Sequence, residues 1–174
     1  MMTYNFDDES FDTNREHEIS RIINNHSDKI YTYKNYDDMY DYDLIVKDKE
    51  LDMFLGYIEV EVSNYEFLGG RNWYHSFLKR KVLKFCDDCF IDELKDNALK
   101  TIYIKFNKNF GLDDCICCDM KTISRLPSDY QNKTNSNYRN CLFRTTIDDK
   151  RIKVGINECI KYIEDYLLFF RVVN

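Results

Sequence analysis

Hydrophobic residues near the start of the chain follow first a helical spacing and then an extended one. Residues 13–26 carry hydrophobic side chains at intervals of three and four, after a Thr or Asn cap and with acidic residues early, which predicts an amphipathic helix. Hydrophobic and polar residues then alternate with a period of two, as they do in strands. We therefore expect three strands, at residues 30–33, 41–46 and 55–62, with a hairpin connection over 47–52.

The middle of the chain predicts a second helix and two more strands. Residues 73–85 follow Gly69 and Gly70 and place four hydrophobic side chains on one helical face, namely Tyr74, Leu78, Val82 and Phe85. Hydrophobic runs at residues 100–106 and 114–120 are short and rich in Ile, Tyr and Phe or in Cys and Ile, which indicates strands.

The last part of the chain predicts a loop, a hairpin and a final helix. Residues 124–139 are polar, residues 141–154 have the pattern of a hairpin, and residues 156–171 carry one hydrophobic stripe after Gly155. The whole order of elements predicts an α/β fold in which a central mixed sheet is flanked by helices. At 174 residues, we expect a single domain covering residues 1–174.

The composition is that of a folded protein outside the membrane. Hydrophobic residues make up 44% of the chain and charged residues 32%, and no run approaches the roughly 18 apolar residues of a membrane-spanning helix. The acidic N-terminal residues do not resemble an export signal, so we expect an intracellular protein with reduced cysteines. The net charge of −6 provides no general attraction for nucleic acid, although a local basic stripe can still bind phosphates.

Three acidic residues in the predicted strands form the main candidate for chemistry. In the segment Glu59-Val60-Glu61-Val62, both acids point to one side of the strand and both valines to the other. Asp43 lies in the preceding strand, where antiparallel pairing would bring it near Glu59. Such carboxylates suit a hard cation such as Mg²⁺. The alternative is that the acids line the solvated face of an amphipathic strand.

The order of these elements resembles the PD-(D/E)xK nuclease superfamily, which has the restriction-endonuclease-like fold. The resemblance covers approximately residues 13–106. It implies that Asp43 and Glu59 bind Mg²⁺ or Mn²⁺ and that Glu61, at the position usually held by a lysine, binds a second ion or orients the attacking water. The chain departs from the motif in having Tyr42 before the aspartate in place of proline.

The same resemblance implies further site residues on the predicted helices. Some members carry the motif lysine on the following helix, where this chain offers Lys79 and Lys81, and Lys81 is the preferred candidate. Glu16 or Glu18 would match the glutamate that some members carry on the first helix. The activity implied is hydrolysis of a phosphodiester by metal-activated water.

The resemblance implies that the protein binds nucleic acid, with DNA as the expected partner. Arg71, Trp73 and Arg80 are candidate contacts with it, although a lone tryptophan at the start of a helix also serves as a packing anchor. A homodimer would provide the two active sites that cutting both strands of a duplex requires. No membrane partner is expected.

Two other interpretations remain open at this point. Cys86 and Cys89 have the spacing of a zinc knuckle, but the other candidate ligands, Cys115, Cys117 and Cys118, lie in a predicted strand, so zinc is not expected. The second interpretation is a catalytically inactive interaction module with the same fold, whose acids lie on an exposed face.

Overall fold

The computed structural model contains thirteen helices and strands whose bounds lie within the residues that it describes. The residues that it describes are 9–36, 42–63, 74–78, 81–82, 96–107, 114–129 and 142–171. The first elements are α1 (Glu9–His26), β1 (Ile30–Lys34), β2 (Leu44–Asp48), β3 (Phe54–Ser63) and β4 (Tyr74–Leu78). The others are α3 (Asp96–Leu99), β5 (Thr101–Asn107), β6 (Cys115–Asp119), α4 (Met120–Ser124), β7 (Ser128–Asp129), β8 (Leu142–Thr146), β9 (Lys153–Val154) and α5 (Ile156–Phe169).

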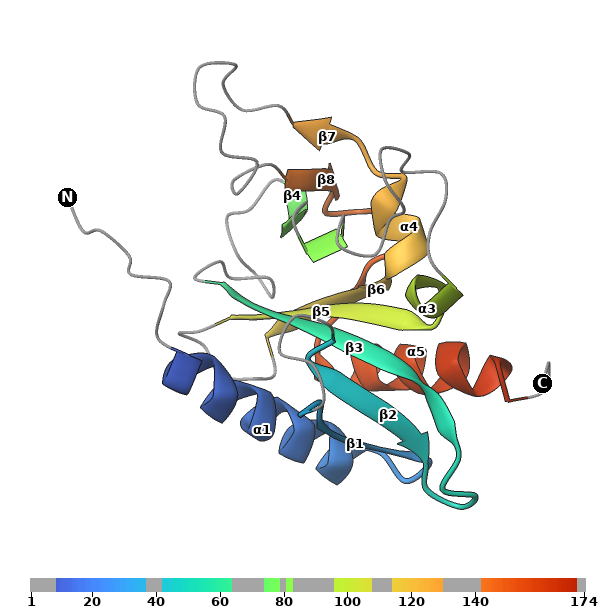
Figure 1. The fold of residues 1–174 in the computed structure, drawn as a ribbon. Helices are drawn as coiled ribbons and strands as arrows, with labels where there is room; N and C mark the ends of the chain where they lie inside the picture. Colours follow the sequence, from blue (N-terminus) through green and yellow to red (C-terminus); the bar gives the residue numbers. More distant parts are fainter. Residues whose placement is uncertain are drawn as a thin grey trace.

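Six of the strands form a mixed sheet in the order β1-β2-β3-β5-β6-β9. Strands β3 and β5 are parallel, and the other neighbours in this sheet are antiparallel. A smaller sheet has the order β4-β8-β7. Helices α1 and α5 cover one side of the large sheet, while the small sheet and α4 lie on the other (Figure 1). The predicted α/β fold with a central mixed sheet flanked by helices is confirmed.

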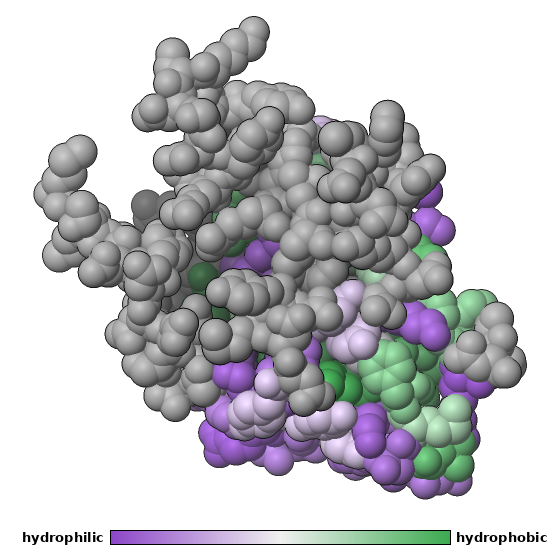
Figure 2. Space-filling view, viewed as in Figure 1, coloured by the Kyte–Doolittle hydropathy of each residue, from purple (hydrophilic) through white to green (hydrophobic). Residues whose placement is uncertain are grey.

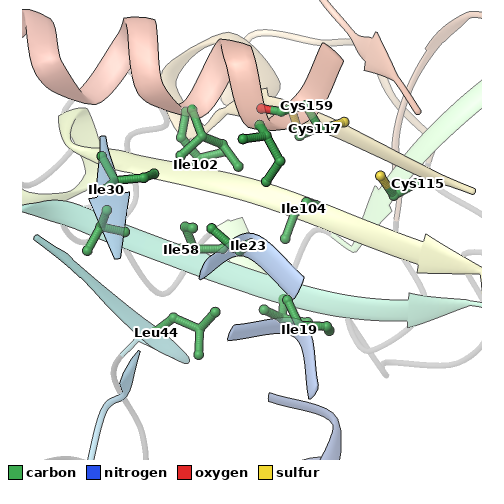
Figure 3. Packing of buried hydrophobic residues seen from close by; sticks show 14 of the residues in the cluster. Ile19, Ile23, Ile30, Leu44, Ile58, Ile102, Ile104, Cys115, Cys117 and Cys159 are labelled. Atoms are coloured by element: carbon green, nitrogen blue, oxygen red, sulfur yellow. The ribbon is translucent and has the colours of Figure 1, made fainter. Parts of the chain in front are cut away.

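A hydrophobic core fills the space between the large sheet and helices α1 and α5. Residues of both helices contact side chains that point to this side of the sheet, as Figure 3 shows for Ile19 and Ile23 of α1 and for Ile58 and Ile104 of β3 and β5. Because side chains alternate along a strand, residues at every second position of each strand enter this core. The predicted helix at the C-terminal end is confirmed as α5, which begins directly after Gly155.

A second core lies between the large sheet and the small one. Phe77 of β4 and Phe143 of β8 pack there with Tyr103 of β5, and the Phe77 and Tyr103 rings meet edge to face at 5.3 Å. Strand β5 is therefore buried on both sides, and all seven of its residues are buried. The polar residues of β5 are thus placed in an interior where each needs a partner.

Three predictions about residues 74–154 are wrong. Residues 74–78 form a strand in place of the start of a helix, because Phe77 packs inward and β4 pairs with β8. The expected hairpin over 141–154 does not form, since β8 joins the small sheet while β9 pairs with β6 of the large one. The expected polar loop contains β7, which pairs with β8.

Several predicted boundaries also move. Helix α1 begins at Glu9, earlier than expected, and β2 begins at Leu44. The strand expected over 114–120 ends at Asp119, whose side chain accepts a hydrogen bond from the backbone N–H of Thr122 at 2.8 Å and so caps α4. Within the described part of the chain, no helix has both the length and the apolar character that crossing a membrane requires.

Replacing Gly56 with alanine is expected to destabilise the fold. A Cβ at this position would lie 2.2 Å from the backbone oxygen of Lys100 and 2.9 Å from Cδ2 of Leu167, so β3 would have to move away from its neighbours. We expect Gly56→Ala to lower the free energy of unfolding by about 1–3 kcal/mol. Urea denaturation measures this, with Lys161→Ala on the exposed side of α5 as a control. Equal stability of the two variants would contradict the close approach.

Candidate active site

Strand pairing brings two of the predicted acids side by side. In the antiparallel register of β2 and β3, Leu44 lies opposite Ile58, so that Asp43, directly before β2, is beside Glu59. Oδ2 of Asp43 accepts a hydrogen bond from the backbone N–H of Val60 at 2.6 Å. This bond fixes the Asp43 carboxylate against the middle of β3.

The acids of β3 are buried. Glu59 is 0% exposed and Glu61 is 8% exposed, whereas Val60 between them enters the core beneath α1 and α5. The alternation of the strand is as predicted, but the interpretation of a solvated acidic face is wrong. A buried carboxylate is costly unless a cation or hydrogen-bond donors compensate its charge.

Lys81 compensates Asp43 and Glu59 together. Its Nζ lies 2.9 Å from Oε1 of Glu59 and 3.3 Å from Oδ2 of Asp43, and it also donates to the backbone oxygen of Val60. The next residue, Val82, is fully buried in the second core and anchors this part of the chain. The structure therefore brings together Asp43, Glu59 and the lysine preferred from the sequence.

The surroundings of Lys81 keep it protonated. Burial by itself lowers the pKa of a lysine, but the carboxylates of Glu59 and Asp43 outweigh this effect and raise the pKa of Lys81 above its ordinary value. Lys81 is thus an ammonium group at neutral pH. It can donate hydrogen bonds and stabilise negative charge, and it cannot serve as a general base.

Glu61 belongs to a separate buried network. In the parallel register of β3 and β5, Glu61 lies beside Lys105, whose Nζ is 2.9 Å from Oε1 of Glu61. Tyr103 donates its hydroxyl hydrogen to Oε2 of Glu61, and the Lys105 ammonium also donates to the backbone oxygen of Ser76 at 2.9 Å. Each oxygen of the Glu61 carboxylate therefore has a partner within the chain.

Lys105 and Tyr103 were not identified from the sequence. Lys105 is 1% exposed, and burial next to Glu61 raises the pKa of Tyr103 well above its ordinary value, so that the phenol remains a donor. A signal was present, because a lysine between Ile104 and Phe106 interrupts a hydrophobic strand. Its partner could not be named without knowing that β5 pairs with β3.

Of the two candidate glutamates on α1, Glu16 lies nearer the site. Its carboxylate is 3.0 Å from Nζ of Lys34, and burial, opposed by this lysine and reinforced by the negative charge of Asp43, raises the pKa of Glu16. Glu18 is exposed. The remaining candidates, namely Lys79, Arg71, Trp73 and Arg80, lie outside the described residues.

The described residues offer no ready-made cage for a metal ion. Among them, no three His, Cys, Asp or Glu side chains lie close enough together to hold one. Cys115 and Cys117 of β6 enter the core beneath α5, whereas Cys118 enters the second core. Cys86 and Cys89 lie outside the described residues.

Comparison with known proteins adds one structural likeness. No protein-family profile matches the chain. No curated protein sequence matches it either. Among solved structures, a nuclease from a fusselovirus is similar to it over 97% of this chain and 99% of that chain, with a TM-score of 0.48 and 15% sequence identity.

Loss of the Lys105 ammonium is expected to destabilise the protein strongly. In Lys105→Met, the Glu61 carboxylate stays buried without its cation, which should cost about 3–5 kcal/mol of unfolding free energy. The double variant Lys105→Met/Glu61→Met should recover most of this loss, because neither charge is then buried. Urea denaturation of both proteins measures the difference.

Lys47→Met provides the matched control for this experiment. Lys47 pairs with Asp52, whose side chain is 72% exposed, so we expect little change in stability, because water already solvates both charges. If Lys105→Met is no less stable than Lys47→Met, the Glu61 and Lys105 charges are not compensating each other in the interior.

Proposed function

We propose that the protein is a divalent-metal-dependent nuclease that hydrolyses phosphodiester bonds in nucleic acid, with DNA as the expected substrate. The observation that supports this proposal is the convergence of Asp43, Glu59 and Lys81 from three separate segments of the chain. Two carboxylates next to a lysine provide ligands for a cation and a positive charge for a phosphate. A purely structural ion pair would need only one acid.

The donor set suits Mg²⁺ or Mn²⁺. These hard ions prefer oxygen ligands, and Mg²⁺ commonly takes one or two carboxylates and completes its coordination with waters and substrate phosphates. Asp43 and Glu59 are the two residues that would hold it. The Asp43 side chain is 20% exposed and the Glu59 side chain is 1% exposed. Solvent therefore reaches the pair of carboxylates at Asp43, whereas Glu59 lies in the interior.

The reaction would be attack of water on phosphorus. The bond to the leaving oxygen breaks, and one strand end keeps the phosphate while the other becomes a hydroxyl. A bound Mg²⁺ or Mn²⁺ supplies activation of the water and neutralisation of charge on the phosphoryl oxygens. Lys81 donates from Nζ to the negative charge that develops in the transition state. Asp43, held by the Val60 N–H, keeps the orientation that the reaction requires.

Glu61 and Glu16 have supporting roles in this proposal. The Glu61 carboxylate is held by Tyr103 and Lys105, and it fixes β3 relative to β5 so that Glu59 is correctly placed. Glu16 pairs with Lys34 at the edge of the site and adds negative charge beside Asp43.

The location of Lys81 also bears on the proposed family. In the PD-(D/E)xK superfamily, some members have the motif lysine on the helix that follows the acidic strand and not on the strand itself. Here Glu61 takes the strand position, and the ammonium comes from the helical residues 81–82. This arrangement supports placement of the chain in that superfamily. An inactive module with its acids on an exposed face agrees less well with the burial of Glu59.

Removal of either proposed metal ligand should abolish cleavage and leave the fold intact. We expect Asp43→Asn and Glu59→Gln to lower the rate of plasmid nicking in Mn²⁺ by at least about 100-fold, since each removes charge from the reacting centre. Asp165→Asn, on the exposed side of α5, should nick at the parent rate. Folded Asp43→Asn and Glu59→Gln proteins that nick as fast as the parent would refute the nuclease assignment.

Binding of Mn²⁺ should stabilise the parent protein through the same acids. At a Mn²⁺ concentration of 100 times its Kd, the stabilisation should be about 2.7 kcal/mol, visible as a rise in melting temperature. Asp43→Asn should lose this rise. Lys81→Met should keep it, because removing the ammonium leaves both carboxylates available to the ion. If Mn²⁺ raised the melting temperature of Asp43→Asn as much as that of the parent, the ion would bind at another site.

A further inference from the structure

The face of the sheet that carries Asp43 and Glu59 continues away from them as a row of aromatic residues. One step along each strand, Ile45 lies opposite Tyr57 and also opposite Tyr33 of β1. After a second step, Lys47 lies opposite Tyr31 and, across the irregularity in β2 and β3, opposite Phe54. We call Tyr31, Tyr33, Phe54 and Tyr57 the aromatic platform.

The rings of the platform form two contacting pairs, each with one ring that is exposed. Tyr31 and Tyr33 stack at 6.1 Å between centroids, and Phe54 meets Tyr57 edge to face at 4.9 Å. Tyr33 is 38% exposed and Phe54 is 43% exposed. Hydrophobic side chains appear beside hydrophilic ones in this part of the surface, at the lower right of Figure 2 where the turn between β2 and β3 lies. Exposed aromatic groups of this kind commonly mark a binding surface.

A cation accompanies these rings. Nζ of Lys47 lies 5.9 Å from the centre of the Tyr33 ring and 3.2 Å from Oδ1 of Asp52. Asp52 is mostly exposed, so a phosphate can replace it as the partner of Lys47 at little cost. Aromatic rings with an adjacent ammonium provide both groups that an unpaired nucleotide recognises, a flat apolar surface for the base and a positive charge for the phosphate.

The position of the platform connects it with the proposed reaction. Successive residues on one face of a strand are about 7 Å apart, so the platform begins one such step from the acids. Tyr42 stacks on the Tyr57 ring at 3.7 Å, so a nucleic-acid strand whose phosphate lies at Asp43 and Glu59 would pass these two rings and reach the exposed rings of Tyr33 and Phe54. Bases of a duplex have their flat surfaces covered by stacking, whereas bases of a single strand expose them.

We propose that the aromatic platform binds a single-stranded segment of the substrate by stacking bases on Tyr33 and Phe54, with Lys47 contacting a phosphate. The proposal rests on the proposed function, since it takes the substrate to be nucleic acid. The platform proposal adds that the nucleic-acid strand is single-stranded where it lies on the β1 side of Asp43 and Glu59. The platform is therefore a second contact region, separate from the acids and Lys81.

The test measures binding of a fluorescein-labelled twelve-nucleotide oligothymidylate by anisotropy in EDTA, where no metal-dependent cleavage occurs. We expect the parent to bind it more tightly than a labelled hairpin duplex. Tyr33→Ala and Phe54→Ala should each raise the Kd about ten-fold, within the range found for loss of one stacked base. Tyr33→Phe, which keeps the ring, should bind like the parent. Phe169→Ala removes an aromatic side chain that is 66% exposed at the end of α5 and should have no effect.

Three results would overturn the proposal. The first is that Tyr33→Ala and Phe54→Ala bind the oligonucleotide as tightly as the parent, and the second is that Phe169→Ala weakens binding as much as they do. The third is that the parent sediments as a dimer and Phe54→Ala as a monomer, while both bind the oligonucleotide equally. The last result would make the platform a contact between copies of the chain. Nicking by the parent is measured separately. If the parent nicks DNA but the alanine variants bind the oligonucleotide as well as the parent does, only the platform proposal is refuted. If binding depends on the two rings but the parent does not nick DNA, the platform proposal is supported and the nuclease assignment is refuted.

Discussion

The burial of two negative charges on β3 is the constraint on which the rest of the structure depends. Glu59 and Glu61 lie on the side of the large sheet that faces the second core, where a carboxylate without a partner would be strongly unfavourable. Lys81 and Lys105 supply the compensating charges, each from a different segment. The residues that compose the candidate site are therefore the same residues that make this side of the sheet stable.

The two sides of the large sheet differ in the residues that they carry. On the side of α1 and α5, the core consists mainly of aliphatic residues and cysteines, and it holds both helices against the strands (Figure 3). On the other side, the small sheet covers β5 and contributes the backbone oxygen of Ser76 to Lys105. A rigid apolar layer behind the strands allows acids in front of them to be held in a fixed orientation.

The N-terminal half of the fold was predictable because its local pattern agrees with its final environment. Strands β1 to β3 alternate between the two sides, and the alternation alone placed Glu59 and Glu61 together. Residues 74–78 were misassigned because their hydrophobic positions fit a helix as well as a strand, and pairing with β8, far along the chain, decided between them. The same dependence on distant pairing concealed Lys105, whereas the order of motif residues was enough to identify Asp43, Glu59 and Lys81 as candidates.

The pair formed by Glu61 and Lys105 also restricts how β3 and β5 can assemble. These parallel strands come from segments about forty residues apart, and hydrophobic residues alone would tolerate more than one alignment, because β5 is apolar at Ile102, Ile104 and Phe106. Sliding one strand by two residues would keep the hydrophobic side chains on their side of the sheet but would move Lys105 about 7 Å along the strand from Glu61 and separate their charges. Electrostatics thus favours the observed alignment of these two strands over the shifted one.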